Sequence, residues 1–303
     1  MIAIDLGSNT LRVTKLECTS GRFVANFEKV VKTADMLECT GVIHHESVDR
    51  IIYALQEVQK QIDFSAGKIV AVTTEALRRA KNSQEVLLRI KRETGVSFSV
   101  ISGEEEAVLT LLAVKHRLAK LHFASKTFVL VDMGGGSTEL IFSYADKVIS
   151  RSFPVGIVTF AQSYSNLESL SVALSDKMSD IGRFCMETYA ENGKVDSFIA
   201  TAGTPTTVVA MKLGQSYSCY DPKKINGTAL QKEELDFYLR KLLAMSFLER
   251  EVSVGAGRSD LIAAGILMYK EIFNLLEFNI CVVIDDGLRE GVALEWCHQM
   301  IQE

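Results

Sequence analysis

Two hydrophobic periods alternate along the first third of the chain. Residues 2–4 and 11–16 read as apolar strands around a glycine turn, and residues 22–31 read as a third extended segment. In residues 47–62 the apolar positions recur at helical spacing, with Ser47 as the expected N-cap. A strand, a helix, a strand and a helix are then expected at residues 68–73, 84–94, 98–101 and 104–120. These elements predict a first α/β unit over residues 1–115.

The pattern then begins again. The segments IAIDLGSNTLRV and LVDMGGGSTELI share one layout, in which an apolar strand, an aspartate, an apolar residue and a glycine turn lead into a second strand. Asp5 and Asp132 occupy equivalent places. A glycine hairpin alone is common and is the plainer interpretation of each copy. Two copies in one chain favour a duplicated domain with a cleft between the halves.

Composition narrows the classes of function. The 303 residues are 48% hydrophobic, and the formal net charge is −5, which argues against general binding to DNA or an anionic membrane. No apolar run has the length of a signal segment or a membrane span. The six cysteines include no CxxC pair, so neither a disulfide framework nor a zinc site is expected. A reducing cytoplasm fits this pattern best.

The glycine-rich turn of the second copy is suited to binding phosphate, because its backbone N–H groups are open to close approach. It lacks the GK[ST] of a Walker A loop, and it leads into an apolar strand where a dinucleotide fingerprint would lead into a helix. Asp132 stands two residues before the turn and is placed to bind magnesium, although a solvated turn aspartate remains the alternative. The turn consists of Gly134, Gly135, Gly136, Ser137 and Thr138.

Further polar residues lie beside these turns. Glu139 precedes an apolar run, where a buried carboxylate needs a metal, an arginine or a water; an outward-facing strand residue is the alternative. Arg78 follows a buried strand, where α/β sheets place their ligands. The turn before the helix that starts near Gly203 and Thr204 presents N–H groups to an anion, or is a plain strand-to-helix turn. Arg12, Arg258 and Arg289 are among the other nearby basic residues.

Seven segments in this order resemble the exopolyphosphatase and guanosine pentaphosphate phosphatase (Ppx/GppA) family. That family belongs to the superfamily of actin, sugar kinases and heat-shock chaperones. The resemblance spans nearly the whole chain, and ISGEEEA with DMGGGSTE is the diagnostic combination. The segments are IDLGSNTLR, TEALRRAKN, ISGEEEA, VDMGGGSTE, AGTPTT, GRSDLIAAG and GLREG.

The resemblance implies an α/β fold of two actin-like ATPase (ribonuclease H-like) domains, each with a mixed five-stranded sheet, around a central cleft. The N-terminal domain covers residues 1–115, with a C-terminal helix at 289–302 packing back on it. The second domain covers residues 116–288. The sequence stops soon after GLREG, whereas longer relatives continue into helical domains that hold long polyphosphate, so we expect shorter substrates.

The resemblance also implies roles for single residues. Glu106 matches the family's proposed general base for water, and Arg78 matches an arginine of the active-site cleft. Asp132 and Glu139 match acidic positions for Mg²⁺ or Mn²⁺ and catalysis, with Asp5 as a further metal candidate. The positions expected to bind phosphate are Ser8, Asn9, Arg12, Gly134, Gly135, Gly136, Ser137, Gly203, Thr204 and Arg258.

The predicted function is release of a terminal phosphate from polyphosphate or from guanosine pentaphosphate, a nucleotide of the stringent response. Backbone N–H groups, arginine and metal offset the substrate's charge while Glu106 deprotonates water. Two other functions stay open: an ATP-dependent kinase or ATPase of the same superfamily, and a non-catalytic sensor of polyphosphate or stringent-response nucleotides. A homodimer is expected from the family alone.

Overall fold

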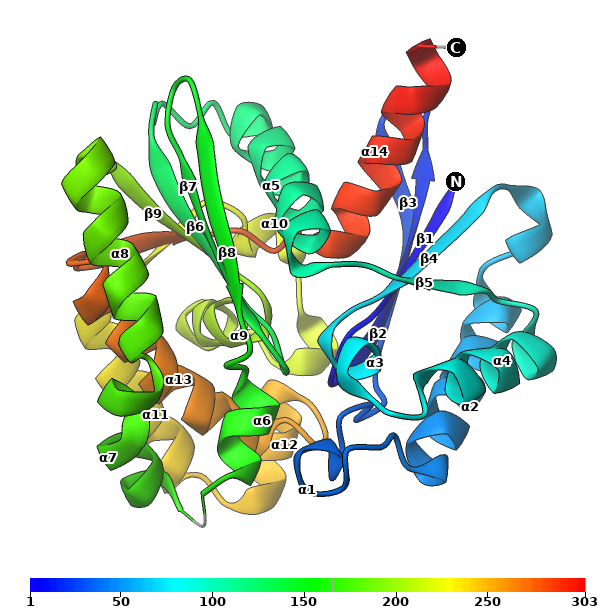
Figure 1. The fold of residues 1–303 in the computed structure, drawn as a ribbon, viewed down its shortest axis with the longest axis horizontal. Helices are drawn as coiled ribbons and strands as arrows, with labels where there is room; N and C mark the ends of the chain where they lie inside the picture. The colour runs from blue at the N-terminus through cyan, green and yellow to red at the C-terminus, as the bar shows by residue number, and fades with distance from the viewer. Residues whose placement is uncertain (165, 303) are drawn as a thin grey trace. The chain divides into compact units, whose positions relative to one another are not determined.

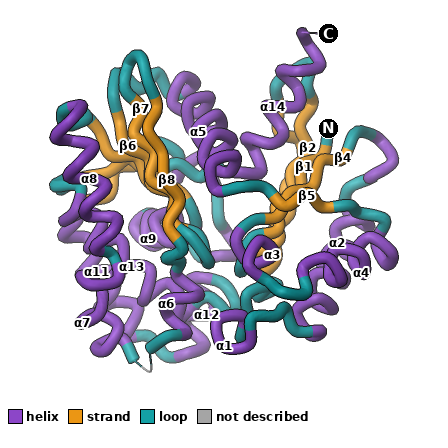
Figure 2. The backbone as a smooth tube through the Cα atoms, viewed as in Figure 1, coloured by secondary structure: helices purple, strands orange, loops and turns teal. Residues whose placement is uncertain are grey.

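The computed structural model describes residues 1–164 and 166–302. The chain forms two compact units, one made of Met1–Lys115 with Asp286–Glu303 and the other of His116–Asp285. Each unit has one mixed β-sheet with helices packed against it, as the ribbon and tube views show (Figures 1 and 2). The predicted α/β fold class is therefore confirmed.

The sheet of the first unit has five strands in the order β3-β2-β1-β4-β5. The glycine turn makes β1 and β2 an antiparallel hairpin, while β4 and β5 run parallel to β1. Every residue of β1 is buried, as expected for a central strand covered on both faces. The bounds are β1 (Ile2–Leu6), β2 (Thr10–Glu17), β3 (Arg22–Val30), β4 (Ile69–Thr73) and β5 (Phe98–Val100).

The helices of the first unit include one that begins earlier than the sequence predicts. The helix expected to start after Ser47 begins at His45, with His44 as N-cap, so the N-cap prediction was wrong. The Ser47 hydroxyl is buried and donates to the carbonyl of Lys32 instead. The bounds are α1 (Leu37–Thr40), α2 (His45–Gln61), η1 (Phe64–Ala66), α3 (Glu75–Arg79), α4 (Ser83–Thr94) and α5 (Gly103–Lys120).

The C-terminal helix α14 (Leu288–Gln302) packs on β1 and β2. Its apolar side chains share a core with residues of β1, β2, β4 and α5. A side chain at Gly291 would put its Cβ only 2.0 Å from the carbonyl oxygen of Leu109, so glycine is what allows α14 to lie this close to α5. The position of α5, which carries Glu106, therefore depends on α14.

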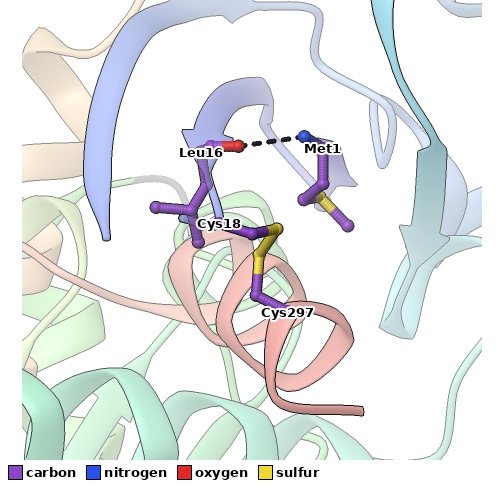
Figure 3. The surroundings of a disulfide bond; sticks show 4 residues. All are labelled: Met1, Leu16, Cys18 and Cys297. Carbon is purple, nitrogen blue, oxygen red and sulfur yellow. Dashed lines mark hydrogen bonds between the residues drawn. A yellow bond between two sulfur atoms is a disulfide. The ribbon is translucent and has the colours of Figure 1, made fainter. Parts of the chain in front are cut away.

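A disulfide joins Cys18, just beyond β2, to Cys297 on α14 (Figure 3). Their Cα atoms are 5.3 Å apart, and the two residues are separated by 279 positions in the sequence. Nearby, the N-terminal amine of Met1 donates to the carbonyl of Leu16 at 2.9 Å. The expectation that the chain has no disulfide was wrong, because CxxC spacing reports only local pairs, whereas this pair is brought together by the packing of α14.

The sheet of the second unit has six strands in the order β10-β11-β9-β6-β7-β8. Five were expected; the sixth is the short edge strand β10, which pairs antiparallel with β11. β6 and β7 form the second glycine hairpin, and β9 and β11 continue the sheet in parallel with β6. The bounds are β6 (Phe128–Met133), β7 (Thr138–Ser143), β8 (Val148–Phe153), β9 (Ser197–Thr201), β10 (Thr228–Gln231) and β11 (Ile280–Val283).

Aromatic contacts anchor the helices of the second unit to its sheet. Phe142 on β7 makes edge-on contacts with Phe184 and Tyr189 of α8, and Phe198 on β9 contacts Phe273 of α13. None of the described helices is long and apolar enough to cross a bilayer. The bounds are α6 (Ile157–Gln162), α7 (Leu167–Lys177), α8 (Ser179–Asn192), α9 (Gly203–Lys212), η2 (Tyr217–Cys219), α10 (Pro222–Ile225), α11 (Lys232–Ala244), α12 (Phe247–Val254) and α13 (Ser259–Leu275).

Candidate functional site

In each unit most of the predicted site residues lie at or just beyond the carboxyl ends of the parallel strands. In the first unit these ends are those of β1, β4 and β5, followed by the first glycine turn, the segment of Arg78 and the segment of Glu106. In the second unit they belong to β6, β9 and β11. This edge is where open α/β sheets bind ligands. Each unit therefore presents one group of candidate residues at one edge of its own sheet.

The two glycine turns have the same hydrogen-bonded geometry. In the first, the N–H of Gly7 donates to the carbonyl of Thr10 at 3.0 Å; in the second, the N–H of Gly134 donates to the carbonyl of Ser137 at 2.9 Å. Both bonds close a four-residue turn between antiparallel strands. Ser8 and Asn9 therefore occupy the places that Gly135 and Gly136 occupy in the second turn. The repeat found in the sequence is a structural repeat as well.

The charged residues beside the first turn are arranged by strand register. Asp5 lies directly opposite Arg12 across β1 and β2, so both side chains are on one face of the sheet. Arg12 also lies opposite Glu28, and its Nε donates to that carboxylate at 3.0 Å. Asp5 is buried, and Arg12 is held within the sheet by an ion pair with Glu28.

Arg78 and Glu106 are neighbours in the first unit. The Nη2 atom of Arg78 lies 3.6 Å from Oε2 of Glu106, and Nη1 of Arg78 donates to the carbonyl of Ile101 at 2.6 Å. Glu106 is buried in the first turn of α5. That turn is fixed by Ser102 and Glu105, whose side chains accept each other's backbone N–H at 3.1 and 2.8 Å. Of the acidic residues in this first turn, Glu105 caps the helix and Glu106 faces Arg78.

The second glycine turn is supported by the start of α6. The N–H groups of Ile157 and Val158 donate to the carbonyls of Gly134 and Gly135 at 3.0 and 2.8 Å. Gly156 packs so closely on this turn that a Cβ there would lie 2.4 Å from backbone atoms of Gly135 and Gly136. Its φ of −123° suits any residue, so the need for glycine comes from this contact. Sequence reasoning missed Gly156, because the contact arises only from packing.

Asp132 and Glu139 face each other across β6 and β7. Directly opposite residues of an antiparallel pair place their side chains on the same face, where like charges destabilise the sheet. Glu139 is almost fully buried, and its Oε1 accepts a hydrogen bond from Ser152 on β8 at 2.7 Å. A divalent cation would offset the paired charges, and oxygen ligands of this kind suit Mg²⁺ or Mn²⁺. This donor pair therefore fits the predicted metal.

In the described part of the chain, protein side chains alone do not enclose such an ion. Among the described residues, no three His, Cys, Asp or Glu side chains gather into a metal-binding group. Mg²⁺ is commonly held by one or two carboxylates, with substrate phosphates and water completing its shell. Asp132 and Glu139 therefore match a metal that binds together with a phosphate substrate. Asp5, the third predicted ligand, belongs to the other unit.

The turn before α9 combines a strained backbone with a buried arginine. Ala202, the N-cap of α9, has φ 74° and ψ −176°, a conformation that residues other than glycine rarely adopt and that costs about 1–3 kcal/mol. Arg258 is buried, and its Nη2 lies 2.6 Å from where a Cβ of Gly203 would stand. Thr204 is buried as well. The structure thus brings Gly203 and Arg258 together, and it shows the strained backbone of Ala202, the first residue of the AGTPTT segment.

A buried tyrosine braces this end of the second sheet. The hydroxyl of Tyr269, on α13, donates to the carbonyl of Thr201 at 2.7 Å, where β9 ends beside Asp132. Burial raises the pKa of Tyr269 well above its usual value, and the nearby charge of Asp132 adds to this shift. The phenol therefore stays neutral and keeps its proton as a hydrogen-bond donor.

Comparisons with a family profile and with known proteins point to the same family. The profile of the Ppx/GppA phosphatase family matches residues 17–300. The chain is 26% identical to exopolyphosphatase 1 of Mycobacterium tuberculosis, over 96% of this chain and 86% of that protein. It is also 26% identical to exopolyphosphatase 1 of Mycobacterium leprae, over 96% and 87% of the two chains.

Solved structures extend the similarity to the fold. The PPX-GPPA enzyme of Aquifex aeolicus is 29% identical, with a TM-score of 0.75 over 97% of this chain and 98% of that one. An exopolyphosphatase from Cytophaga hutchinsonii has a TM-score of 0.85 over 98% and 97% of the two chains. Because the second is only 22% identical, it speaks for the fold alone.

Proposed function

The chain belongs to the Ppx/GppA phosphatase family, and from this premise we propose that it hydrolyses phosphoanhydride bonds, releasing the terminal phosphate of inorganic polyphosphate. Guanosine pentaphosphate is the second proposed substrate, since it carries the same kind of bond at its end. The observation that carries the proposal is the pairing of Arg78 with the buried carboxylate of Glu106. A buried base beside a cation is suited to activate water next to a polyanion.

The proposed reaction assigns each group a single task. Glu106 accepts a proton from water at its carboxylate, and the water oxygen forms a bond to the terminal phosphorus. The bond from that phosphorus to the bridging oxygen breaks, giving orthophosphate and a chain one unit shorter. Arg78 orients the carboxylate of Glu106 and offsets the negative charge of the substrate's phosphate groups. The N–H groups of the glycine turns are proposed to bind phosphate oxygens.

Mg²⁺ or Mn²⁺ is the proposed metal, held by Asp132 and Glu139 with Asp5 as a further candidate. When bound, it supplies charge stabilisation for the transferred phosphoryl group. Gly203, Thr204 and Arg258 are proposed to contact a phosphate group further along the substrate. Arg258 contributes a buried guanidinium and α9 contributes the N–H groups of its first turn.

Two other functions remain as rivals. An ATP-dependent kinase or ATPase of the same fold would use the two turns for ATP, and a sensor would bind the same anions without turnover. The pairing of Arg78 with the buried carboxylate of Glu106 favours transfer to water, because a sensor needs no base. A location in the cytoplasm and a homodimeric state are parts of the proposal as well.

The test measures orthophosphate released from tripolyphosphate, from longer polyphosphates of defined length, from guanosine pentaphosphate and from ATP. Each substrate is tested with Mg²⁺, with Mn²⁺ and with a chelator. We expect metal-dependent release from polyphosphate without any added acceptor. Release from ATP alone, or only when a sugar acceptor is present, would favour a kinase or ATPase. Tight binding of polyphosphate without release would favour the sensor.

A further inference from the structure

Glu75 is a buried carboxylate that the proposed reaction does not use. It is the first residue of α3, and only 7% of its surface is exposed. A buried carboxylate is costly unless cations and hydrogen bonds compensate its charge. Two arginines one helical turn further along do so. Nε and Nη2 of Arg78 donate to Oε2 of Glu75 at 3.1 and 2.8 Å, and Nε of Arg79 lies 3.8 Å from Oε1.

The same Arg78 side chain faces three groups from three segments. It donates to Glu75 on α3 and to the carbonyl of Ile101, which lies just before α5. Both are true hydrogen bonds, whereas the 3.6 Å between Nη2 and Glu106 is longer than one. The guanidinium is therefore held in place by Glu75 and Ile101, and Glu106 lies beside a cation that is already fixed.

The contacts of Arg78 with Glu75 affect how readily Glu106 can act as a base. A carboxylate bonded tightly and alone to an arginine is stabilised in its charged form, so it takes up a proton less readily. Glu75 accepts two of the N–H groups of Arg78 and offsets its positive charge. Arg78 can then orient Glu106 without neutralising it.

We propose that Glu75 is a positioning residue for the reaction, because it fixes Arg78 at a distance from which Arg78 orients the carboxylate of Glu106 and leaves it basic. This inference rests on the proposed function. An alternative explanation is purely structural: acidic residues at helix starts with arginines three and four positions later stabilise many helices. The two explanations differ in what the side chain must supply, since a structural filler needs the right size and a positioning residue needs the negative charge.

Two substitutions separate these requirements. Glu75→Gln keeps the size and one acceptor oxygen but removes the charge, and Glu75→Asp keeps the charge on a shorter side chain. Turnover (kcat) and KM for polyphosphate are measured with saturating metal. We expect Glu75→Gln to lower kcat by about 10- to 100-fold, with KM changed much less, and Glu75→Asp to retain more activity than Glu75→Gln. If Gln is tolerated better than Asp, the role is structural and the proposal fails.

A matched control is Glu38→Gln, which removes the same charge from a half-exposed partner of Arg79 at 2.9 Å. Its kcat should stay within about twofold of the parent, as is usual for an exposed pair. A double-mutant cycle completes the test: in the Glu106→Gln background, Glu75→Gln should have little further effect, because its action passes through Glu106. Equal losses in both backgrounds would overturn the proposal. A parent enzyme that releases no phosphate would instead refute the proposed function.

Discussion

Replacing Gly156 by alanine tests whether the second glycine turn must keep its position for activity. A Cβ at residue 156 would lie 2.4 Å from the carbonyl carbon and oxygen of Gly135 and from the carbonyl carbon of Gly136. Carbon contacts are comfortable at about 3.5 Å, so the turn or the start of α6 must move by about 1 Å. All three contacts are with backbone atoms, so no side-chain rotation can relieve them.

The size of the effect follows from that displacement. A misplacement of about 1 Å costs on the order of 10²-fold in rate, which corresponds to about 2.7 kcal/mol of transition-state stabilisation. The movement also strains the bonds from the N–H groups of Ile157 and Val158 to the carbonyls of the turn. We therefore expect Gly156→Ala to lower kcat/KM for polyphosphate by about 100-fold.

The assay compares phosphate release and thermal unfolding for Gly156→Ala and for Gly182→Ala. Gly182 lies within α8 of the same unit, and a Cβ there would meet only the flexible end of Leu275, at 3.0 Å. This control should keep its activity, because a leucine methyl group can rotate away. If folded Gly156→Ala protein keeps kcat/KM within about twofold of the parent, the turn does not position the substrate, and the steric reasoning is refuted.

Three further predictions follow from single contacts. Ser152→Ala removes the hydrogen-bond donor to Glu139 and should raise the Mg²⁺ concentration needed for half-maximal activity by about 10-fold. The control Ser150→Ala should leave this concentration unchanged. Equal metal dependence in both variants would contradict the role of Ser152. Reducing the disulfide of Cys18 and Cys297, or changing Cys297 to alanine, should cost about 2–5 kcal/mol of unfolding free energy, because it closes a loop of 279 positions; an unchanged urea midpoint would contradict it. Iodoacetamide at pH 8 should label the exposed Cys39 and Cys219 and spare the buried Cys185. Burial raises the pKa of Cys185 to about 12, so little of it is thiolate at this pH. Peptide mass spectrometry that shows Cys185 labelled as fast as Cys39 would contradict this prediction.

The parts of the fold that sequence predicts best are those written in local patterns. Both glycine hairpins could be read from one shared layout, and their registers place Asp5 opposite Arg12 and Asp132 opposite Glu139. The helix start at Ser102 could be predicted too, because capping depends on residues three positions apart.

What sequence does not predict depends on tertiary packing. β10 has only four residues and forms a strand by pairing with the edge of β11. Ser47 looks like an N-cap, but its hydroxyl donates to the backbone carbonyl of Lys32 in another segment. Cys18 and Cys297 pair across almost the whole chain, and Gly156 is required only because α6 returns to the turn. The roles proposed for the site residues are predictions as well, because each role depends on contacts with a substrate.

The central claim is that Glu106 activates water for attack on a terminal phosphate. The most direct measurement follows polyphosphate hydrolysis in oxygen-isotope-labelled water, with the parent and with Glu106→Gln, and analyses the released orthophosphate by mass spectrometry. We predict one labelled oxygen for each phosphate released by the parent, and a loss of about 10²- to 10⁴-fold in turnover for folded Glu106→Gln. Unlabelled phosphate, or a Glu106→Gln protein as active as the parent, would contradict the account.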